Sequence, residues 1–505
     1  MATSVRDLMS SPPVTCDPDA SLAEAAGIMH DHDIGSVVVT NLGKVTGIVT
    51  ERDLLRAAAG HADPLREPVH LWMTVNPDVL APDEEAGAAW TSLTHHHYRH
   101  LPVVEGGTLV GVVSIRDLLE VAQIRPANES GTDVPKGLEG VVVAETAVGD
   151  VRGLEGFYHY RQYSAVELAA SRSLEDVWQL LFDGELPDRQ SAEAFAAEVA
   201  ALRPIPDGLA SLLPGLASSG APLDVLRTGV SLLGAELGWR PTHDIDAAEL
   251  RLQALQLCSV VPTLLTATHR LRNGLEPVPP RDDLSYAANY LRMLLGEEAP
   301  AAHVRAVEQY LMLTIDHGFN ASTFTARVIT STGADLAAAV TGAIGALSGP
   351  LHGGAPSRAL DMLDDIATPD RAEAWVRAAI ECGDRIMGFG HRVYKTDDPR
   401  SVFLRGVARS LGGPLVEFAE QVERTTVDVL AEVKPGRQLY TNVEFFAGVV
   451  MHACGIPREM FTPTFASSRT IGWATQVMEQ AHDNRLIRPA ARYVGPPPPQ
   501  PVPAR

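Results

Sequence analysis

Two histidines of this chain stand in glycine-rich turns, where an imidazole has room to act on a ligand. His352 lies in the stretch SGPLHGGA, and His391 lies 39 positions later in MGFGHRVY. Glycine permits sharp backbone turns and places no side chain beside its neighbour. A single histidine in such a turn is commonly structural. Two in the same setting favour one site that is built from two loops.

Further ionisable residues complete a set that suits one reaction type. His317 precedes a predicted helix start, and Glu444 stands among the apolar residues of the stretch NVEFF. Each arginine of this half, taken alone, is more typical of a surface ion pair than of a ligand site. The set as a whole contains three histidines, one carboxylate and three arginines, namely His317, His352, His391, Glu444, Arg400, Arg469 and Arg488.

This set suits carbon–carbon bond formation from a thioester. Removal of a proton next to a thioester carbonyl needs a carboxylate base and a donor aimed at the oxygen that becomes an enolate. Attack on a second carbonyl needs another donor there. A dicarboxylate acceptor suits arginine, whose planar guanidinium binds a carboxylate through two hydrogen bonds. Glu444, the histidines and the arginines supply these three functions.

Helices must position most of these residues. Leu336, Val340, Ile344 and Leu347 recur at helical spacing among alanines and glycines, which predicts a close-packed buried helix that ends at Ser348. Short strand-like runs follow residue 138, and helical periodicity then dominates as far as residue 484. The polyproline tail, residues 495–505, has nothing to bury and is predicted to be disordered.

Composition sets the broad class of the protein. At 505 residues the chain is long enough for two or three domains, and its formal charge of −22 argues against nucleic acid or an anionic membrane as a bulk partner. The N-terminus has no signal-peptide pattern, and no stretch is expected to reach membrane-spanning length. The cysteines are far apart and predict buried thiols in a reducing cytoplasm, with no disulfide framework and no metal site, at Cys16, Cys258, Cys382 and Cys454.

Residues 1–122 contain an internal repeat with a constant offset of 64, with copies at about 1–60 and 65–122. The stretch GIVTERDLL of the first copy corresponds to GVVSIRDLL in the second. Each copy alternates helix and strand, and because a unit that short buries little core, the two copies are expected to pack together. The histidine run at 95–97, with His100, offers metal ligands, but no cysteine or carboxylate lies nearby in the sequence.

The doubled G-x-V-[ST]-x-R-D-L-L signature resembles the cystathionine-β-synthase (CBS) domain pair over nearly all of residues 1–122. In that family the cleft between copies often binds an adenine nucleotide. The resemblance implies a nucleotide effector, with ribose and phosphate contacts from Thr50, Asp53, Ser114 and Asp117. The alternative is a pair that mediates oligomerisation alone. Residues 123–137 are polar, with proline and glycine, and are predicted to be a linker.

The second half is similar to the citrate synthase family, of the bacterial citrate or 2-methylcitrate synthase type. The stretches SGPLHGGA, MGFGHRVYKTDDPR, DHGFNASTFTARV and FASSRTIGWATQVMEQ carry the resemblance, which covers roughly residues 138–494. It implies that His352 donates to the thioester oxygen, that His391 polarises the ketone of oxaloacetate, and that Glu444 stands where the family has its base. It also implies substrate-carboxylate contacts from His317, Arg400, Arg469 and, in the other subunit's site, Arg488, and coenzyme A contacts from Gly388, Gly390 and Lys395.

Two positions depart from the family pattern. The usual D-H-E is D-H-G here, and Gly318 is expected to alter only the packing near His317. The usual base is an aspartate in N-x-D, whereas this sequence has Glu444, whose extra methylene moves the carboxylate by about one bond; a displacement of about 1 Å can cost roughly a hundredfold in rate. Either the backbone has adjusted, or the enzyme is slow, or it handles another acyl group.

The predicted architecture is a CBS pair of α/β type, followed by a mostly α-helical unit with a large domain at 138–353 and 455–494 and a small domain at 354–454. The cleft between those two domains would hold the site, and a homodimer is the minimum because Arg488 serves the partner's site. The predicted function is citrate synthesis from acetyl-CoA and oxaloacetate, without a tightly bound cofactor. The alternatives are 2-methylcitrate synthesis from propionyl-CoA, and a nucleotide-sensing regulatory protein with weakened catalysis.

Overall fold

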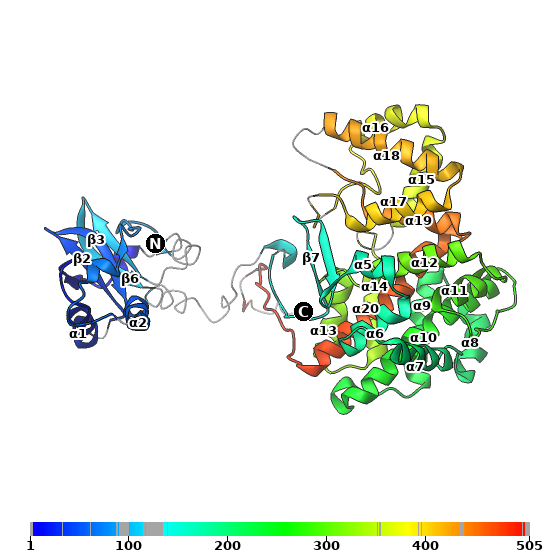
Figure 1. Ribbon diagram of the computed structural model, residues 1–505, viewed down its shortest axis with the longest axis horizontal. Helices are drawn as coiled ribbons and strands as arrows, with labels where there is room; N and C mark the ends of the chain where they lie inside the picture. Colours follow the sequence, from blue (N-terminus) through cyan, green and yellow to red (C-terminus); the bar gives the residue numbers. More distant parts are fainter. Residues whose placement is uncertain are drawn as a thin grey trace, which may run out of the picture. The chain divides into compact units, whose positions relative to one another are not determined.

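The computed structural model describes residues 4–32, 34–60, 62–86, 89, 100–114, 117, 135–138, 140–350, 352, 355–391, 393–394, 396–433, 439–496 and 498–499. The chain divides into two compact units (Figure 1). One comprises Met1–Val141 with Pro489–Arg505, and the other is Val142–Arg488.

The first unit contains two similar halves. In the first half, α1 (Leu22–His32) and α2 (Glu51–Ala59) accompany a sheet of β1 (Thr15–Cys16), β2 (Ser36–Asn41), β3 (Lys44–Thr50) and β4 (Thr74–Val75), in that order. In the second half, β5 (His100–Glu105) pairs with β6 (Thr108–Ser114). The antiparallel register Ser36 to Thr50 returns as His100 to Ser114, which is the offset of 64 predicted from the sequence. The repeat is therefore also a structural repeat.

Each half buries a segment that belongs to the other copy of the repeat. Val5, on the 3-10 turn η1 (Val5–Asp7), packs in the second half's core with Leu101 and Val103. Val69, on η2 (Val69–Leu71), packs in the first half's core with Val37, Val39 and Val49. The sequence copies therefore exchange their leading segments, and neither core is complete without the other copy. This exchange agrees with the expectation that the copies pack together.

The second unit begins with a small antiparallel sheet and continues as helices. The sheet contains β7 (Gly149–Arg152), β8 (Phe157–Tyr160) and β9 (Tyr163–Ser164). The helices are α5 (Ala165–Ser171), α6 (Leu174–Asp183), α7 (Arg189–Ala201), α8 (Asp207–Ala217), α9 (Pro222–Glu236), α10 (Ala247–Arg272), α11 (Tyr286–Leu295), α12 (Ala301–Thr314), α13 (Ala321–Ser331), α14 (Leu336–Leu347), α15 (Ala355–Ile366), α16 (Ala372–Glu381), α17 (Pro399–Leu411), α18 (Pro414–Val433), α19 (Val443–Ala453) and α20 (Phe461–His482). The described residues of this unit also form the 3-10 turns η4 (Thr242–Asp244), η5 (Pro369–Arg371) and η6 (Arg458–Met460), whereas η3 (Lys136–Leu138) lies at the end of the first unit.

The helices of the second unit form two groups that share one core. Figure 1 shows α15 to α19, in yellow and orange, gathered beside the larger group of mostly green helices. Buried apolar residues from both groups belong to one continuous cluster, in which α20 packs against α10, α13 and α14. Helix α14 ends where it was predicted to end, because Ser348 follows its last residue, and the side chain of Asp335 caps its first turn. All four of its predicted core residues are buried.

Two expectations from the sequence need correction. Helix α10 is long and apolar enough to span a membrane by length and composition, but 83% of its apolar window is buried inside the unit, so it is a core helix. Cys16, Cys258 and Cys454 are buried thiols as predicted, whereas Cys382 is exposed. It directly follows α16, where the chain turns at the surface.

Candidate active site

A short backbone pairing holds the glycine-framed loop in front of His391. The carbonyl of Gly388 accepts the N–H of Asn442 at 2.8 Å, and the carbonyl of Gly390 accepts the Asn442 side-chain amide at 3.1 Å. Both glycines have φ near +80°, and a Cβ on Gly388 would lie 2.9 Å from the Cβ of Phe445. Glycine is therefore needed here, as the sequence suggested, and the pairing fixes the loop against the start of α19.

The hydrogen bonds of His391 identify its tautomer. Its Nδ1 accepts the backbone N–H groups of Val393 and Tyr394 at 3.0 and 3.1 Å. A neutral imidazole that accepts at Nδ1 carries its proton on Nε2. The guanidinium of Arg400 lies 3.4 Å from that Nε2. Two donors therefore face the same space, which suits an oxygen of a carbonyl or carboxylate.

His317 is the second histidine of this cluster, and its ring centre lies 5.6 Å from that of His391. Its Nε2 is 3.0 Å from the hydroxyl of Tyr394, and its ring packs on Tyr158. Burial, and the nearby charge of Arg400, hold the pKa of His317 well below its ordinary value. His317 is therefore neutral, and it contributes hydrogen bonds without adding charge.

Arg400 is held in place by a buried carboxylate that sequence reasoning did not select. Its Nε and a terminal nitrogen donate to the two oxygens of Asp398 at 3.0 and 2.8 Å. Asp398 also caps the first turn of α17 and accepts the backbone N–H of Val443 at 3.1 Å. One carboxylate thus orients the arginine and ties α17 to the start of α19.

His352 is oriented by the first turn of α13. Its Nε2 lies 2.8 Å from the hydroxyl of Ser322 and 3.3 Å from the Ser322 backbone nitrogen. The indole of Trp473, on α20, donates to the same hydroxyl at 3.2 Å. The Ser322 hydroxyl donates to the side chain of Asn320 at 2.8 Å, whereas the Ser322 backbone N–H donates to His352 Nε2. Since Nε2 accepts that N–H, the proton of the neutral ring lies on Nδ1, which becomes the donor toward a ligand. Burial and the charge of Arg469 lower the pKa of His352 to about 4.

Arg469 connects α20 with the histidines. It is buried, donates from Nε to the carbonyl of Thr314 at 2.8 Å, and stacks on Phe465. Its charge adds to the effect of burial in lowering the pKa values of both His317 and His352. Burial raises the pKa of neighbouring Asp316 to about 6.

Gly318, where the family pattern has glutamate, adopts φ of +60°. A Cβ there would lie 3.2 Å from the Cγ2 of Val151, and the Gly318 N–H donates to Asp316 at 3.1 Å. Left-handed backbone favours glycine over glutamate, so this turn is built for the residue it has. The expected change in packing near His317 is located at Val151.

Glu444 is the second residue of α19, and its backbone N–H donates to the capping side chain of Asn442 at 3.0 Å. Its side chain is half-buried. Burial raises the pKa of its carboxyl group to about 7; Arg400 opposes this rise, and Asp398 adds to it. A carboxylate with a pKa near the operating pH is well suited to act as a general base.

Of the remaining predicted residues of this site, one is not described and one makes no contact with the described residues of the cluster. Lys395 lies outside the described residues, as do the histidines at 95–97. Arg488 is exposed at the end of the second unit, and within the part of the chain that the structure describes it forms no hydrogen bond or ion pair. One chain therefore unites His317, His391, Arg400, Glu444, His352 and Arg469 without Arg488.

The predicted nucleotide-binding residues bond to each other within each copy of the repeat. The Thr50 hydroxyl donates to Asp53 at 2.7 Å, and the Thr50 N–H donates to the same oxygen at 2.9 Å. The Ser114 N–H donates to Asp117 at 2.7 Å, and the Asp117 N–H donates back to the Ser114 hydroxyl at 3.3 Å. These pairs cap helix starts, a structural role that the signature serves with or without a ligand.

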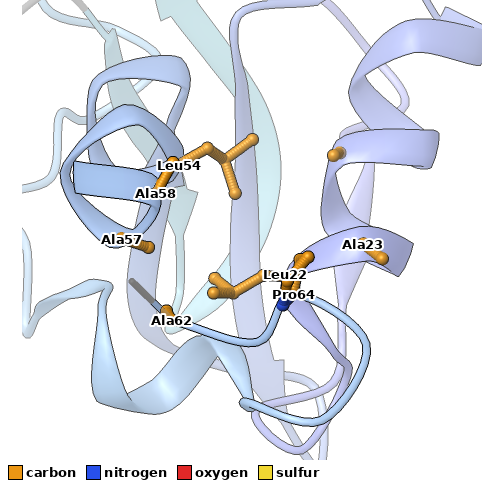
Figure 2. A pocket seen from close by; sticks show the side chains of 8 residues that line it. Leu22, Ala23, Leu54, Ala57, Ala58, Ala62 and Pro64 are labelled. Atoms are coloured by element: carbon orange, nitrogen blue, oxygen red, sulfur yellow. The ribbon is translucent and has the colours of Figure 1, made fainter. Parts of the chain in front are cut away.

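A small pocket of about 140 Å³ lies between α1 and α2 of the first half (Figure 2). Its volume is below the roughly 300 Å³ typical of ligand sites. Its lining residues are all apolar and offer phosphate no donor side chain, so this pocket does not suit a nucleotide. They are Leu22, Ala23, Ala26, Leu54, Ala57, Ala58, Ala62 and Pro64.

Sequence reasoning missed the residues that orient the site. Ser322 follows the capping residue Asn320, and Asp398 precedes a proline at a helix start, so both carry an N-terminal helix signal. That signal predicts a cap and gives no hint of which histidine or arginine the side chain meets. The hydroxyl groups of Tyr158 and Tyr394 carry no local signal, because their partners, Leu313 and His317, lie far away in the chain.

Comparison with known proteins agrees with this geometry. The family model "Citrate synthase, C-terminal domain" matches residues 137–490, and the CBS domain model matches residues 5–60 and 69–123. A 2-methylcitrate synthase of Mycobacterium tuberculosis is 40% identical over 73% of this chain and 93% of its own length. A citrate synthase of Deinococcus radiodurans is 38% identical over 72% of this chain and 96% of its own length.

Solved structures give the same result. The crystal structure of citrate synthase from Thermotoga maritima covers 74% of this chain and 98% of its own, with a TM-score of 0.66 and 36% identity. The Thermoplasma acidophilum citrate synthase, solved as a ternary complex with carboxymethyl coenzyme A and oxaloacetate, gives a TM-score of 0.69 at 30% identity, over the same shares of the two chains. The chain belongs to the citrate synthase family, and it carries a pair of CBS domains before the catalytic unit.

Proposed function

We propose that this acyltransferase condenses acetyl-CoA with oxaloacetate and hydrolyses the resulting thioester to citrate and free coenzyme A. The observation that carries the proposal is the setting of Glu444, a half-buried carboxylate whose pKa is raised to about 7 beside Arg400. It would take a proton from the acetyl methyl group. Neutral His352 would meanwhile donate from Nδ1 to the thioester oxygen, which becomes the enol oxygen.

The second carbonyl would be activated by the His391 cluster. The enol carbon attacks the ketone carbon of oxaloacetate, and the ketone oxygen takes a proton from His391 Nε2. Arg400 and Arg469 bind the two carboxylates of oxaloacetate, as cations with planar, bidentate donors. Water then attacks the thioester carbonyl and releases coenzyme A as the thiol. Lys395, Gly388 and Gly390 are proposed to contact coenzyme A.

A second candidate is 2-methylcitrate synthesis from propionyl-CoA. It is favoured by the Mycobacterium tuberculosis relative, whose identity to this chain is similar to that of the relatives named citrate synthase. One methyl group in an apolar pocket changes rates by about ten- to two-hundredfold at most. The test is steady-state release of free coenzyme A from acetyl-CoA and from propionyl-CoA, each with oxaloacetate. The larger kcat/KM identifies the substrate, and no release from either refutes both candidates.

A regulatory protein without efficient catalysis is the less favoured reading. The glutamate in place of the usual aspartate is the feature that favours this reading, but the raised pKa of Glu444 and its interaction with the charge of Arg400 suit a working base. A chain that had lost catalysis would be under no constraint to keep a carboxylate in such a costly position. Proton exchange of the acetyl methyl group therefore separates the two readings directly.

The assembly, regulation and location are proposed as follows. The protein acts in the cytoplasm. It forms a homodimer or larger assembly in which Arg488 completes the partner's site. This proposal is supported by the exposure of the Arg488 side chain, which has no hydrogen-bond or ion-pair partner among the described residues. The CBS pair binds an adenine nucleotide through Thr50, Asp53, Ser114 and Asp117 and changes the kinetics of the distant site. Such coupling requires different nucleotide affinities in two states of the enzyme.

A further inference from the structure

The β7–β8 hairpin contacts the cluster of His317, His391 and Arg400 through Tyr158, and its β8 strand is anchored to a neighbouring helix. The Tyr158 hydroxyl donates to the carbonyl of Leu313 at 3.2 Å, and the Tyr160 hydroxyl donates to that of Met312 at 2.8 Å. Both carbonyls belong to the last turns of α12. The Tyr158 ring also contacts the ring of His317. The hairpin is therefore fixed in position relative to the site.

The tip of this hairpin touches the backbone that follows His391. A Cβ on Gly153 would lie 2.7 Å from the carbonyl carbon of Val393, 2.9 Å from its Cγ1, and closer still to its carbonyl oxygen. Real Cβ atoms do not approach other atoms so closely, and a backbone carbonyl cannot rotate aside as a side chain can. The φ of Gly153 lies outside the left-handed region, so space, rather than backbone conformation, requires glycine here.

The peptide that Gly153 touches is the one that orients His391. The carbonyl of Val393 and the N–H of Tyr394 belong to a single planar peptide unit. That N–H donates to His391 Nδ1 at 3.1 Å, beside the Val393 N–H at 3.0 Å. A push on the carbonyl therefore moves one of the two donors that keep the proton of His391 on Nε2.

We propose that Gly153 is a positioning residue for His391: its missing side chain lets the hairpin tip pack on the Val393–Tyr394 peptide, and this contact fixes the donor nitrogen that polarises the ketone. The inference rests on the proposed function, in which His391 acts on oxaloacetate. Gly153 itself touches no substrate in this account. It acts through the peptide and through the tautomer of the imidazole.

Gly153→Ala tests the proposal. The added methyl must displace the peptide by about 1 Å, and a displacement of that size at a catalytic group costs about tenfold to a hundredfold in rate. We expect kcat for condensation to fall at least tenfold. Enolisation, followed as deuterium exchange of the acetyl-CoA methyl group with malate bound, should stay within about threefold of the native rate. Malate has an alcohol in place of the ketone, so this exchange does not depend on ketone polarisation.

Gly406→Ala is the matched control. Gly406 lies in α17, and a Cβ there would meet no atom within 4 Å. It should leave both rates unchanged. The same Gly153 substitution on a Val393→Ala background removes the Cγ1 contact and leaves the contact with the backbone carbonyl in place. The loss of condensation should therefore persist there, whereas Val393→Ala alone, with Gly153 retained, should keep both rates.

The outcomes separate the inference from the function on which it rests. Native condensation in Gly153→Ala overturns the inference. Parallel loss of condensation and exchange also overturns it, because it would show general damage to the site. Absence of condensation in the native protein with both acyl-CoA substrates overturns the proposed function instead. Condensation lost and exchange kept is the result we expect.

Discussion

Replacement of Glu444 by glutamine should abolish proton removal and, at alkaline pH, stabilise the folded protein. Glutamine keeps the shape of the side chain and removes its basicity, so methyl-proton exchange of acetyl-CoA should fall by at least about a hundredfold, as expected for a lost general base. Glu444→Asp shortens the side chain by one bond, and a shift of about 1 Å corresponds to roughly a hundredfold loss. We expect this loss because the caps at Asn442 and Asp398 hold the backbone of α19 in place.

The pH dependence follows from the raised pKa. With the pKa of Glu444 at about 7, about half of the carboxylate is ionised at pH 7, roughly a tenth at pH 6 and roughly nine tenths at pH 8. The acid limb of kcat/KM in the native enzyme should therefore have its midpoint near pH 7. A midpoint near the ordinary glutamate value of 4.5 would refute the argument that burial tunes this base.

The raised pKa of Glu444 can also be tested through the stability of the folded protein, without an activity assay. The folded protein holds the Glu444 proton more tightly than the unfolded chain, so the stability of the native protein falls as pH rises from about 4.5 to about 7. The shift from 4.5 to about 7 corresponds to at most about 3 kcal/mol, and the partial exposure of the side chain reduces this to about 1–2 kcal/mol. Glu444→Gln is neutral at every pH and avoids this loss.

The assay compares native protein, Glu444→Gln and the control Glu417→Gln. Glu417 lies in the first turn of α18 and is exposed, so it matches Glu444 in helix position but not in surroundings. The apparent melting temperature of Glu444→Gln, minus that of the native protein, should be larger at pH 8 than at pH 5, and the control should show no such difference. Exchange at the native rate in Glu444→Gln would show that another group is the base.

The remaining predictions concern the other parts of the site and the assembly. His352→Ala and His391→Ala should each lower kcat about a hundredfold or more while circular dichroism and thermal unfolding remain native-like; near-native turnover would contradict the assigned roles. Asp398→Asn leaves a buried arginine without its anion, so it should cost about 3–5 kcal/mol in stability and raise KM for oxaloacetate, measured by thermal unfolding and initial rates. If Arg488 completes the partner's site, Arg488→Ala and Glu444→Gln chains should each be inactive alone, and an equal mixture of the two, unfolded and refolded together, should regain about a quarter of native activity. The reason is that half of the dimers are mixed, and each mixed dimer has one intact site of two. No recovery would place each site within one chain. Calorimetry with AMP, ADP, ATP and S-adenosylmethionine, beside assays of the full chain and a chain lacking residues 1–122, should show binding and altered kinetics with one of them; no heat would leave the pair as an assembly module.

Local features of the sequence determined much of the fold. The spacing of Leu336, Val340, Ile344 and Leu347 gave α14 its buried face, since helical periodicity is a property of neighbouring residues. The glycines around His391 predicted a sharp turn, and the structure places them at φ near +80°. The offset of 64 between the two copies predicted repeated strand pairs, which occur with the same register.

The exchange of leading segments between the two copies could not be predicted from local sequence patterns. The segment near Val5 and the one near Val69 have the same pattern, so either could pack on its own copy or on the other. That choice depends on how the two halves meet in space. Exposure of Cys382 is of the same kind, because burial depends on what packs over the end of α16.

The sequence by itself determined which residue types the site contains, and the tertiary structure decided what each can do. A histidine's proton goes to the nitrogen that is not accepting a hydrogen bond, so the donor atoms of His391 and His352 depend on Val393, Tyr394 and Ser322. The pKa of Glu444 depends on burial and on charges from another helix. These properties depend on contacts between residues that lie far apart in the sequence, and no local pattern of residues encodes such contacts.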